Sequence, residues 1–211
     1  MKRSVGSAAV LVAALVSALS FGTAQSRAGG GLLGGLLGGL LGCQGVTYSQ
    51  PFSSWGDNGS FFLVPGGSFE GANAWSLSGG AQIVNNNEPF FLNSRSDSHS
   101  LLLPPGSSAT SPAACLAVLS PDMRFVGKSS DGSAVHVDIY ASGLLGLVRL
   151  PVSANIALTS SWAPSGQVQL LLQNVLALTN LGKTSIYFRF SPIGSASVQL
   201  DDIYVDPAFH E

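Results

Sequence analysis

The amino-acid sequence predicts an all-β domain in which two antiparallel sheets pack face to face. Turn-forming residues recur at short intervals from Phe61 onward, so there is no room for long helices. The segments between these turns alternate apolar and polar residues, the period of a half-buried strand. Roughly eight or nine such strands, each apolar on one face, must bury those faces against one another, and a two-sheet sandwich is the expected solution.

The chain begins with a pattern typical of a secretory signal peptide, which we assign to residues 1–28. Two basic residues precede an apolar stretch that ends near Phe21, and Ala24 and Ala28 offer two small-residue cleavage positions. The apolar stretch is shorter than the roughly 20 residues of a spanning helix, so a retained membrane anchor is the less favoured alternative. We therefore expect a secreted or cell-surface protein with no integral membrane span in the mature chain.

Residues 29–42 form a Leu/Gly-rich repeat between the signal peptide and the domain. Each glycine disfavours helix by about 1 kcal/mol, so we expect a flexible spacer. A run of leucines in water can also self-associate. This gives an alternative function, a structural cell-envelope or surface protein that assembles through its Leu/Gly-rich arm.

The two cysteines, Cys43 and Cys115, are predicted to form a disulfide. In an oxidising compartment two cysteines of one compact domain usually pair. The bridge would close a loop of about 72 residues and stabilise the fold by about 4 kcal/mol. Residues 40–43 also resemble a bacterial lipobox, but a charged residue and the repeat separate them from the apolar core of the signal peptide, so anchoring through a lipid on Cys43 is the less favoured reading.

Residues 43–211 have the length of one domain and a weakly acidic composition. All 11 acidic residues lie here, against six of the nine basic ones, which gives this part a net charge of −5. Nucleic acid and anionic lipid reward a basic patch, so the charge argues against both as partners. Neutral ligands remain.

Two strands stand out by their alternation, residues 134–141 and residues 186–190. Each places aliphatic or aromatic side chains on one face and polar side chains on the other. If the two strands are neighbours, the polar faces form one patch that combines aromatic rings with hydrogen-bonding groups, the requirements for sugar recognition. The candidate ligand-binding residues are His136, Asp138, Tyr140, Tyr187 and Arg189. The alternative is a solvated outer sheet with cross-strand pairs.

The closing strand contains a change of face. Val198 and Leu200 share one parity, whereas Ile203 and Val205 share the other. One extra residue at Asp201-Asp202 would produce this switch, so we predict a β-bulge there. Two adjacent carboxylates repel each other unless a cation, a basic side chain or water offsets the repulsion.

The two ends of the domain resemble carbohydrate-binding modules with a galactose-binding-domain-like jelly roll. Residues 64–75, VPGGSFEGANAW, are similar to an opening pattern of Gly-x-Phe-Glu followed by Trp, and residues 199–205, QLDDIYV, are similar to the closing strand. Small secreted bacterial proteins of undetermined function share this scaffold. The resemblance implies a two-sheet antiparallel β-sandwich of jelly-roll type in which the first and last strands are neighbours.

In that family the glutamate of the opening motif and the first aspartate of the closing pair commonly hold a structural calcium ion. The resemblance therefore implies Glu70 and Asp201 as ligands, with the backbone carbonyl of Ser68 as a third. Calcium takes 6 to 8 oxygens, so further ligands are needed. The alternative is that Arg124 or Arg149 replaces the cation by pairing with Glu70.

Binding is favoured over catalysis. The sequence contains no Gly-x-Ser-x-Gly, His-Glu-x-x-His or Cys-x-x-Cys motif and no glycine-rich phosphate loop. Trp75 is expected in the core, whereas Trp55, Trp162 and Tyr48 either stack on a sugar or plug the ends of the sandwich. The sequence thus predicts a secreted, non-catalytic module for a neutral or weakly acidic glycan.

Overall fold

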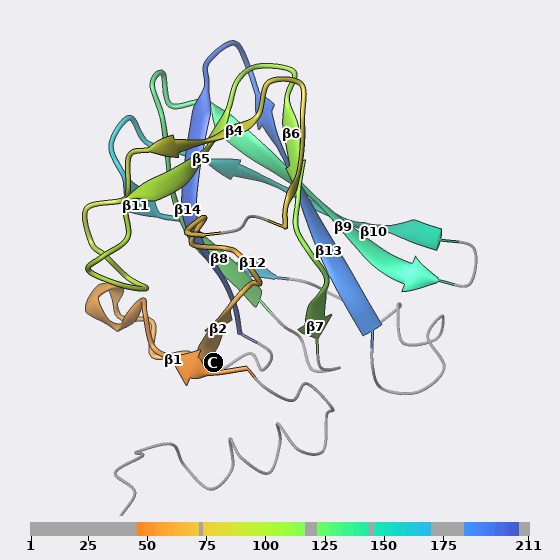
Figure 1. Cartoon of the computed structure of the whole chain (residues 1–211), viewed down its shortest axis with the longest axis horizontal. Helices are drawn as coiled ribbons and strands as arrows, with labels where there is room; N and C mark the ends of the chain where they lie inside the picture. Colours follow the sequence, from red (N-terminus) through yellow and green to blue (C-terminus); the bar gives the residue numbers. More distant parts are fainter. Residues whose placement is uncertain (1–45, 72–73, 117–121, 144–145, 170–183, 207–211) are drawn as a thin grey trace, which may run out of the picture. The chain divides into compact units, whose positions relative to one another are not determined.

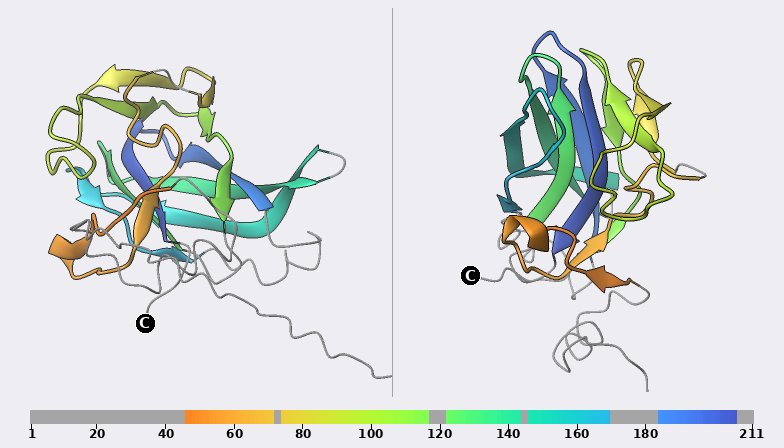
Figure 2. Two further views of the ribbon diagram at one scale, coloured as in Figure 1. Left: turned by 60° about the horizontal axis from the view of Figure 1, so that its bottom comes forward. Right: turned by 90° about the vertical axis from the view of Figure 1, so that its left-hand side faces the viewer.

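The computed structural model describes residues 46–71, 74–116, 122–143, 146–169 and 184–206. These residues form two antiparallel β-sheets and one short 3₁₀ helix, η1 (Ser53–Trp55). None of the helices in these ranges is long and apolar enough to cross a membrane. The sheets pack face to face (Figures 1 and 2), which confirms the predicted all-β sandwich.

The larger sheet has eight strands arranged around β14 (Val198–Asp206). One edge of β14 pairs with β8 (Asp122–Ser129), and the other pairs with β5 (His99–Leu103) in its first half and with β2 (Phe61–Leu63) in its second. The outer strands are β1 (Tyr48–Ser49) on β2, β4 (Gln82–Asn85) on β5, and β11 (Ala163–Pro164) and β12 (Val168–Gln169) on β8.

The smaller sheet has six strands arranged around β13 (Thr184–Ile193). β13 pairs with β9 (Ala134–Gly143) on one edge and with β7 (Ala114–Leu116) and β6 (Ser108–Thr110) on the other. The outermost strands are β10 (Gly146–Ala157) beside β9 and β3 (Ser76–Ser78) beside β6. Because the chain passes repeatedly between the two sheets, the sandwich is of jelly-roll type, as expected.

The core between the sheets is built from the apolar face of each alternating strand. Val135, Val137 and Ile139 of β9 are buried there, and so are Phe188 and Phe190 of β13. Trp75 lies in the same core, 6% exposed, with its ring 5.8 Å from that of Phe190, and its indole Nε1 donates a hydrogen bond to the carbonyl of Pro65. The prediction that Trp75 is a core residue is therefore confirmed.

A second, smaller apolar cluster covers the outer face of the larger sheet. It contains Phe52, Phe61, Val126 and Tyr204. Phe52 stands edge-on to Phe61 at 5.2 Å and to Tyr204 at 5.9 Å. The segment before β2, which includes η1, is thus packed onto the sheet.

The opening motif lies directly beside β14. Val64 N–H donates to the carbonyl of Ile203 at 2.9 Å, and Ile203 N–H donates to the carbonyl of Gly67 at 3.1 Å. A Cβ at Gly67 would come within 2.9 Å of the carbonyl oxygens of Ile203 and Val64, so only glycine fits this approach. The opening motif is therefore a neighbour of the last strand, as predicted, although it lies in the turns that follow β2 and not on a strand.

The predicted β-bulge is also confirmed. Between the pairs Asp201–Val126 and Tyr204–Arg124, β14 advances by one residue more than β8 does. Asp202 has a φ of 48°, in the left-handed region that few side chains adopt. The bulge falls where the partner of β14 changes from β5 to β2.

Candidate functional site

The outer face of the smaller sheet brings the five candidate ligand-binding residues together. β9 and β13 are direct neighbours, and their register places Tyr187 opposite Tyr140 and Arg189 opposite Asp138. His136 lies two residues along β9, opposite Ser191. We call this group, with Arg149 and Asn155 from β10, the outer-face patch.

Arg149 and Asn155 join the patch because β10 is the other neighbour of β9. Arg149 lies opposite Tyr140, and Asn155 lies opposite His136. Neither residue was among the predicted ligand-binding residues. β9 and β10 are consecutive antiparallel strands, so a predicted hairpin would have placed the polar residues of β10 beside those of β9.

A network of polar contacts holds the middle of the patch. Asp138 Oδ1 accepts from Arg149 Nε at 2.8 Å and from Arg149 Nη2, and it lies 3.1 Å from His136 Nε2. On the other strand, Arg189 Nη2 donates to the Ser108 hydroxyl at 3.2 Å. Burial alone would raise the pKa of Asp138, but the hydrogen bonds and charges of Arg149 and His136 outweigh it and lower that pKa, so the carboxylate is ionised at neutral pH.

The two proposed carboxylate ligands of calcium contact different segments. Glu70 contacts Ser98 and His99, Asp201 contacts Glu88 and Asp202, and no hydrogen bond joins Glu70 to Asp201 in the part of the chain that the structure describes. The Glu70 carboxylate accepts from the backbone N–H groups of Ser98 and His99, both at 2.6 Å, and lies 2.8 Å from His99 Nδ1. Burial would raise the pKa of Glu70, but these hydrogen bonds and the charge of His99 lower it. Ser68 is buried in the turn before Glu70.

The alternative in which an arginine pairs with Glu70 is wrong. Arg124 forms its ion pair with Asp57 at 2.7 Å, and Arg149 pairs with Asp138. The ionic partner of Glu70 is His99. Both arginines are therefore paired with carboxylates other than Glu70.

Asp201 belongs to a buried acidic group, together with Asp202 and Glu88. Asp201 Oδ2 accepts from the backbone N–H of Glu88 at 3.2 Å, and Asp202 Oδ2 accepts from the N–H of Asn93 at 3.1 Å. All three carboxyl groups are at most 1% exposed. Burial first, and then their mutual repulsion, raise the pKa of Asp201 to about 9 and that of Asp202 to about 8.

Glu88 matches none of the sequence motifs of this fold. Its carboxylate accepts from the backbone N–H of Leu92 at 2.8 Å and from that of Phe90, so it organises the loop between β4 and β5. That loop brings Glu88 and Asn93 onto the bulge of β14. A carboxylate side chain in a loop can accept hydrogen bonds from the backbone N–H groups that follow it, and this tendency was the only signal in the sequence.

The described residues offer few side-chain ligands for a calcium ion. Over the ranges that the structure describes, no three or more His, Cys, Asp or Glu side chains are grouped so that they could hold a metal ion. Oδ1 of Asp202, however, is buried without a hydrogen-bond partner among the described residues. An unsatisfied oxygen in a buried acidic group suits a cation, whose remaining ligands would be backbone carbonyls and water.

The three loop aromatics have different surroundings. Trp55 is 41% exposed, and Tyr48 is 37% exposed with its ring edge-on to Phe62. Trp162 is half-buried, with the Lys128 ammonium 4.7 Å from its ring centre. Trp55 is thus the tryptophan most open to a ligand.

The predicted disulfide involves a cysteine outside the described residues. The backbone of Cys115 lies in β7, opposite Ser185. Cys43, the spacer of residues 29–42 and the signal peptide of residues 1–28 fall outside the described ranges. The Cys43–Cys115 bridge therefore stays a prediction.

Neither a protein-family model nor a curated protein matches this chain. Solved structures with a similar fold include carbohydrate-binding modules. The CBM22-1 xylan-binding domain of Paenibacillus barcinonensis Xyn10C has a TM-score of 0.43 and 13% identity, over 66% of this chain and 90% of that one. TmCBM61 in complex with β-1,4-galactotriose has a TM-score of 0.42 and 15% identity, over 71% and 98%.

A third similar structure is the family 11 carbohydrate-binding module of the cellulosomal cellulase Lic26A-Cel5E of Clostridium thermocellum. It has a TM-score of 0.40 and 14% identity, over 68% of this chain and 94% of that one.

Proposed function

We propose that this protein is a secreted or cell-surface, non-catalytic module that binds a neutral or weakly acidic glycan through the outer-face patch. One observation carries the proposal: β13 places Tyr187 beside Tyr140 and Arg189 beside Asp138. Two aromatic rings and several fixed hydrogen-bonding groups thus share one solvent-facing surface. A glycan needs both, because its ring C–H groups pack on aromatic faces while its hydroxyls need donors and acceptors.

The charges of the patch support the choice of glycan class. Arg149 and Arg189 stand against a single carboxylate, Asp138, so the fixed charges leave a small positive excess. Such a surface can bind a neutral polysaccharide, and it can also bind a polysaccharide that carries a few carboxylate groups. The Arg149 side chain is 56% exposed, so a ligand can reach its guanidinium directly.

The proposal is tested by isothermal titration against a polysaccharide panel that includes xylan, β-1,4-galactan and β-glucan. We expect saturable binding to at least one member and a loss of tenfold or more in affinity in Tyr187→Ala. Tyr48→Ala is the control, because Tyr48 is an exposed tyrosine on the larger sheet, outside the outer-face patch. No binding by the wild type, or equal losses in both variants, would contradict the proposal.

The proposal includes one structural calcium ion, held by Glu70, Asp201 and the carbonyl of Ser68. What supports it is that the opening motif is hydrogen-bonded to β14 beside a buried acidic group, whose ionised form a cation would stabilise. We expect calcium, and not an equal concentration of magnesium, to raise the melting temperature, and Asp201→Asn to remove the effect. An unchanged melting temperature with calcium and with EDTA would contradict this part alone.

A further inference from the structure

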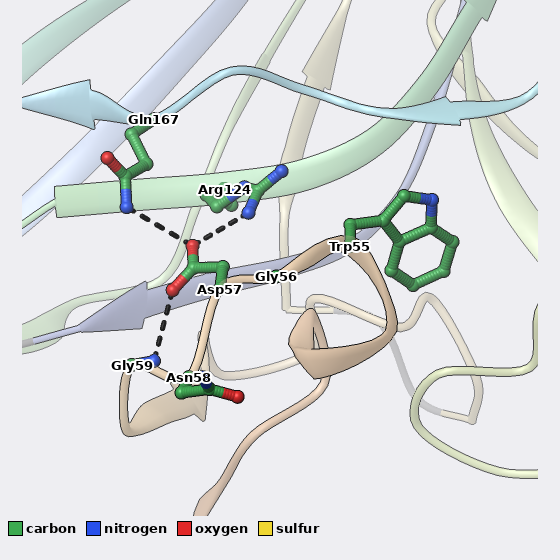
Figure 3. Close-up of a pocket in the computed structure, with 7 residues that line it drawn as sticks. All are labelled: Trp55, Gly56, Asp57, Asn58, Gly59, Arg124 and Gln167. Atoms are coloured by element: carbon green, nitrogen blue, oxygen red, sulfur yellow. Dashed lines mark hydrogen bonds and ion pairs between the residues drawn. The ribbon is translucent and has the colours of Figure 1, made fainter.

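A pocket of about 420 Å³ opens on the outer face of the larger sheet, away from the outer-face patch. It is lined by residues 55–59, Arg124 and Gln167 (Figure 3). Residues 55–59 precede the opening motif, so no part of the family resemblance covers them. The volume lies in the range of about 300–1,000 Å³ that is typical of small-molecule pockets.

The polar side of the pocket is a preorganised network centred on Asp57. Asp57 Oδ2 accepts from Arg124 Nη1 at 2.7 Å and from Gln167 Nε2 at 3.2 Å, while Oδ1 accepts from the Gly59 N–H at 3.0 Å. Arg124 is held in turn by two hydrogen bonds to the carbonyl of Ser165, at 3.1 and 2.8 Å. Figure 3 shows the side chains of Arg124 and Gln167 meeting at the Asp57 carboxylate. Their geometry is fixed before a ligand arrives.

The apolar side of the pocket is the indole of Trp55. It is 41% exposed, and the ring of Phe90 stands edge-on to it, with centroids 5.0 Å apart and an interplanar angle of 81°. Phe90 comes from the loop between β4 and β5, so two loops far apart in sequence hold the indole in place. Such an edge-on contact fixes the orientation of the indole while much of its surface stays open to solvent.

The surroundings of the pocket select against anionic ligands. Asp57 and Arg124 neutralise each other, and the buried carboxyl groups of Asp122 and Asp206 lie close behind them on β8 and β14. The ion pair leaves no uncompensated positive charge at the rim, and the excess of carboxyl groups disfavours an anion. Hydroxyl groups, which both donate and accept, suit a rim of carboxylate and amide groups.

We propose that this pocket is a second saccharide-binding site, which takes one neutral sugar ring against Trp55 with its hydroxyls on Asp57, Asn58 and Gln167. The ligand class rests on the proposed function, whereas the site does not share a residue with the outer-face patch. Arg124 projects from the outer face of the larger sheet, because its neighbours Met123 and Phe125 point into the core. The two sites therefore lie on opposite faces of the sandwich, and one molecule can hold two glycan segments.

The test is the binding stoichiometry of a short ligand, measured by isothermal titration with neutral oligosaccharides of two to four residues chosen from polysaccharides that bind. We expect two sites per wild-type molecule, one in Trp55→Ala, one in Tyr187→Ala and none in the double variant. In two-dimensional NMR, the indole N–H of Trp55 should shift on titration in the wild type and in Tyr187→Ala. Gln167→Ala tests the pocket without removing the indole, and should weaken the second site at least fivefold.

The outcomes separate the two proposals. A single site that Tyr187→Ala abolishes, with no shift of the Trp55 indole N–H, overturns the second site and leaves the outer-face patch intact. A single site that Trp55→Ala abolishes overturns the outer-face patch and supports the pocket. Phe91→Ala is the matched control, because Phe91 is 44% exposed in the same region and does not line the pocket. A loss of binding in that variant equal to the loss in Trp55→Ala would overturn the role of the indole.

Discussion

Replacing Asp122 with asparagine should remove one component of the pH dependence of stability. Asp122 is 2% exposed on β8, opposite Asp206 on β14, and its Oδ1 has no hydrogen-bond partner among the described residues. Burial first, and then the charges of Asp206 and Asp57, raise its pKa to about 7, against a smaller opposing effect of Arg124. Asparagine resembles the protonated side chain in shape and charge, so it should be accommodated.

The sign and size of the effect follow from the two pKa values. Between pH 3.8, the ordinary carboxyl value, and about 7, the folded state keeps a proton that the unfolded state has lost. The free energy of unfolding of the wild type therefore falls across this window as pH rises, by up to about 1.4 kcal/mol per pH unit, or about 4 kcal/mol in all. Above about pH 7 the Asp122 carboxyl group is ionised in both the folded and the unfolded state, so its contribution to the free energy of unfolding no longer changes with pH.

The pH dependence of the free energy of unfolding is measured by urea unfolding of the wild type and of Asp122→Asn, in steps of half a pH unit from pH 4 to 8. We expect the variant to gain up to about 4 kcal/mol relative to the wild type across the series, or roughly 8–16 °C in melting temperature. Asp131→Asn is the control, because the exposed Asp131 carboxyl has a lowered pKa and stays ionised throughout most of the window. A wild-type-to-variant difference that does not change between pH 4 and 8 would refute the reasoning.

Three further outcomes are expected. Trp75→Ala should lower the free energy of unfolding by about 3–5 kcal/mol in urea titrations, because it removes a large ring from the middle of the core. Gly67→Ala should cost about 1–3 kcal/mol, because its methyl group would collide with two backbone carbonyls, whereas Gly166→Ala, with open space around it, should cost under 1 kcal/mol. Deleting residues 29–42 should leave glycan affinity unchanged, as titration of the shortened chain will show; self-association lost on that deletion would instead favour the structural role of the arm.

The sequence predicted those features that depend on strand periodicity. The alternation of residues 134–141 and 186–190 correctly separated core from surface side chains, because a strand places successive residues on opposite faces. The change of parity after Leu200 correctly located the bulge. The motifs at the two ends of the domain correctly predicted that the opening motif lies beside the closing strand.

Features that depend on loops and on long-range pairing were not predictable in this way. Glu88 lies in a polar loop that reads as solvated, yet the loop folds over the bulge and buries it. Asp57 lies before the opening motif, where no pattern linked it to Arg124, 67 residues later. Which carboxylate each arginine meets is decided by strand order and register, so the pairing of Arg149 with Asp138 required the position of β10.

The position of β14 has a consequence for how the chain folds. β14 is the last strand of the described chain and the middle strand of the larger sheet, so β8, β5 and β2 have no shared partner until residues 198–206 have been synthesised. The larger sheet cannot therefore assemble strand by strand as the polypeptide leaves the ribosome. Its pairing is long-range in sequence, which slows folding and leaves β8, β5 and β2 without their central partner until β14 is available.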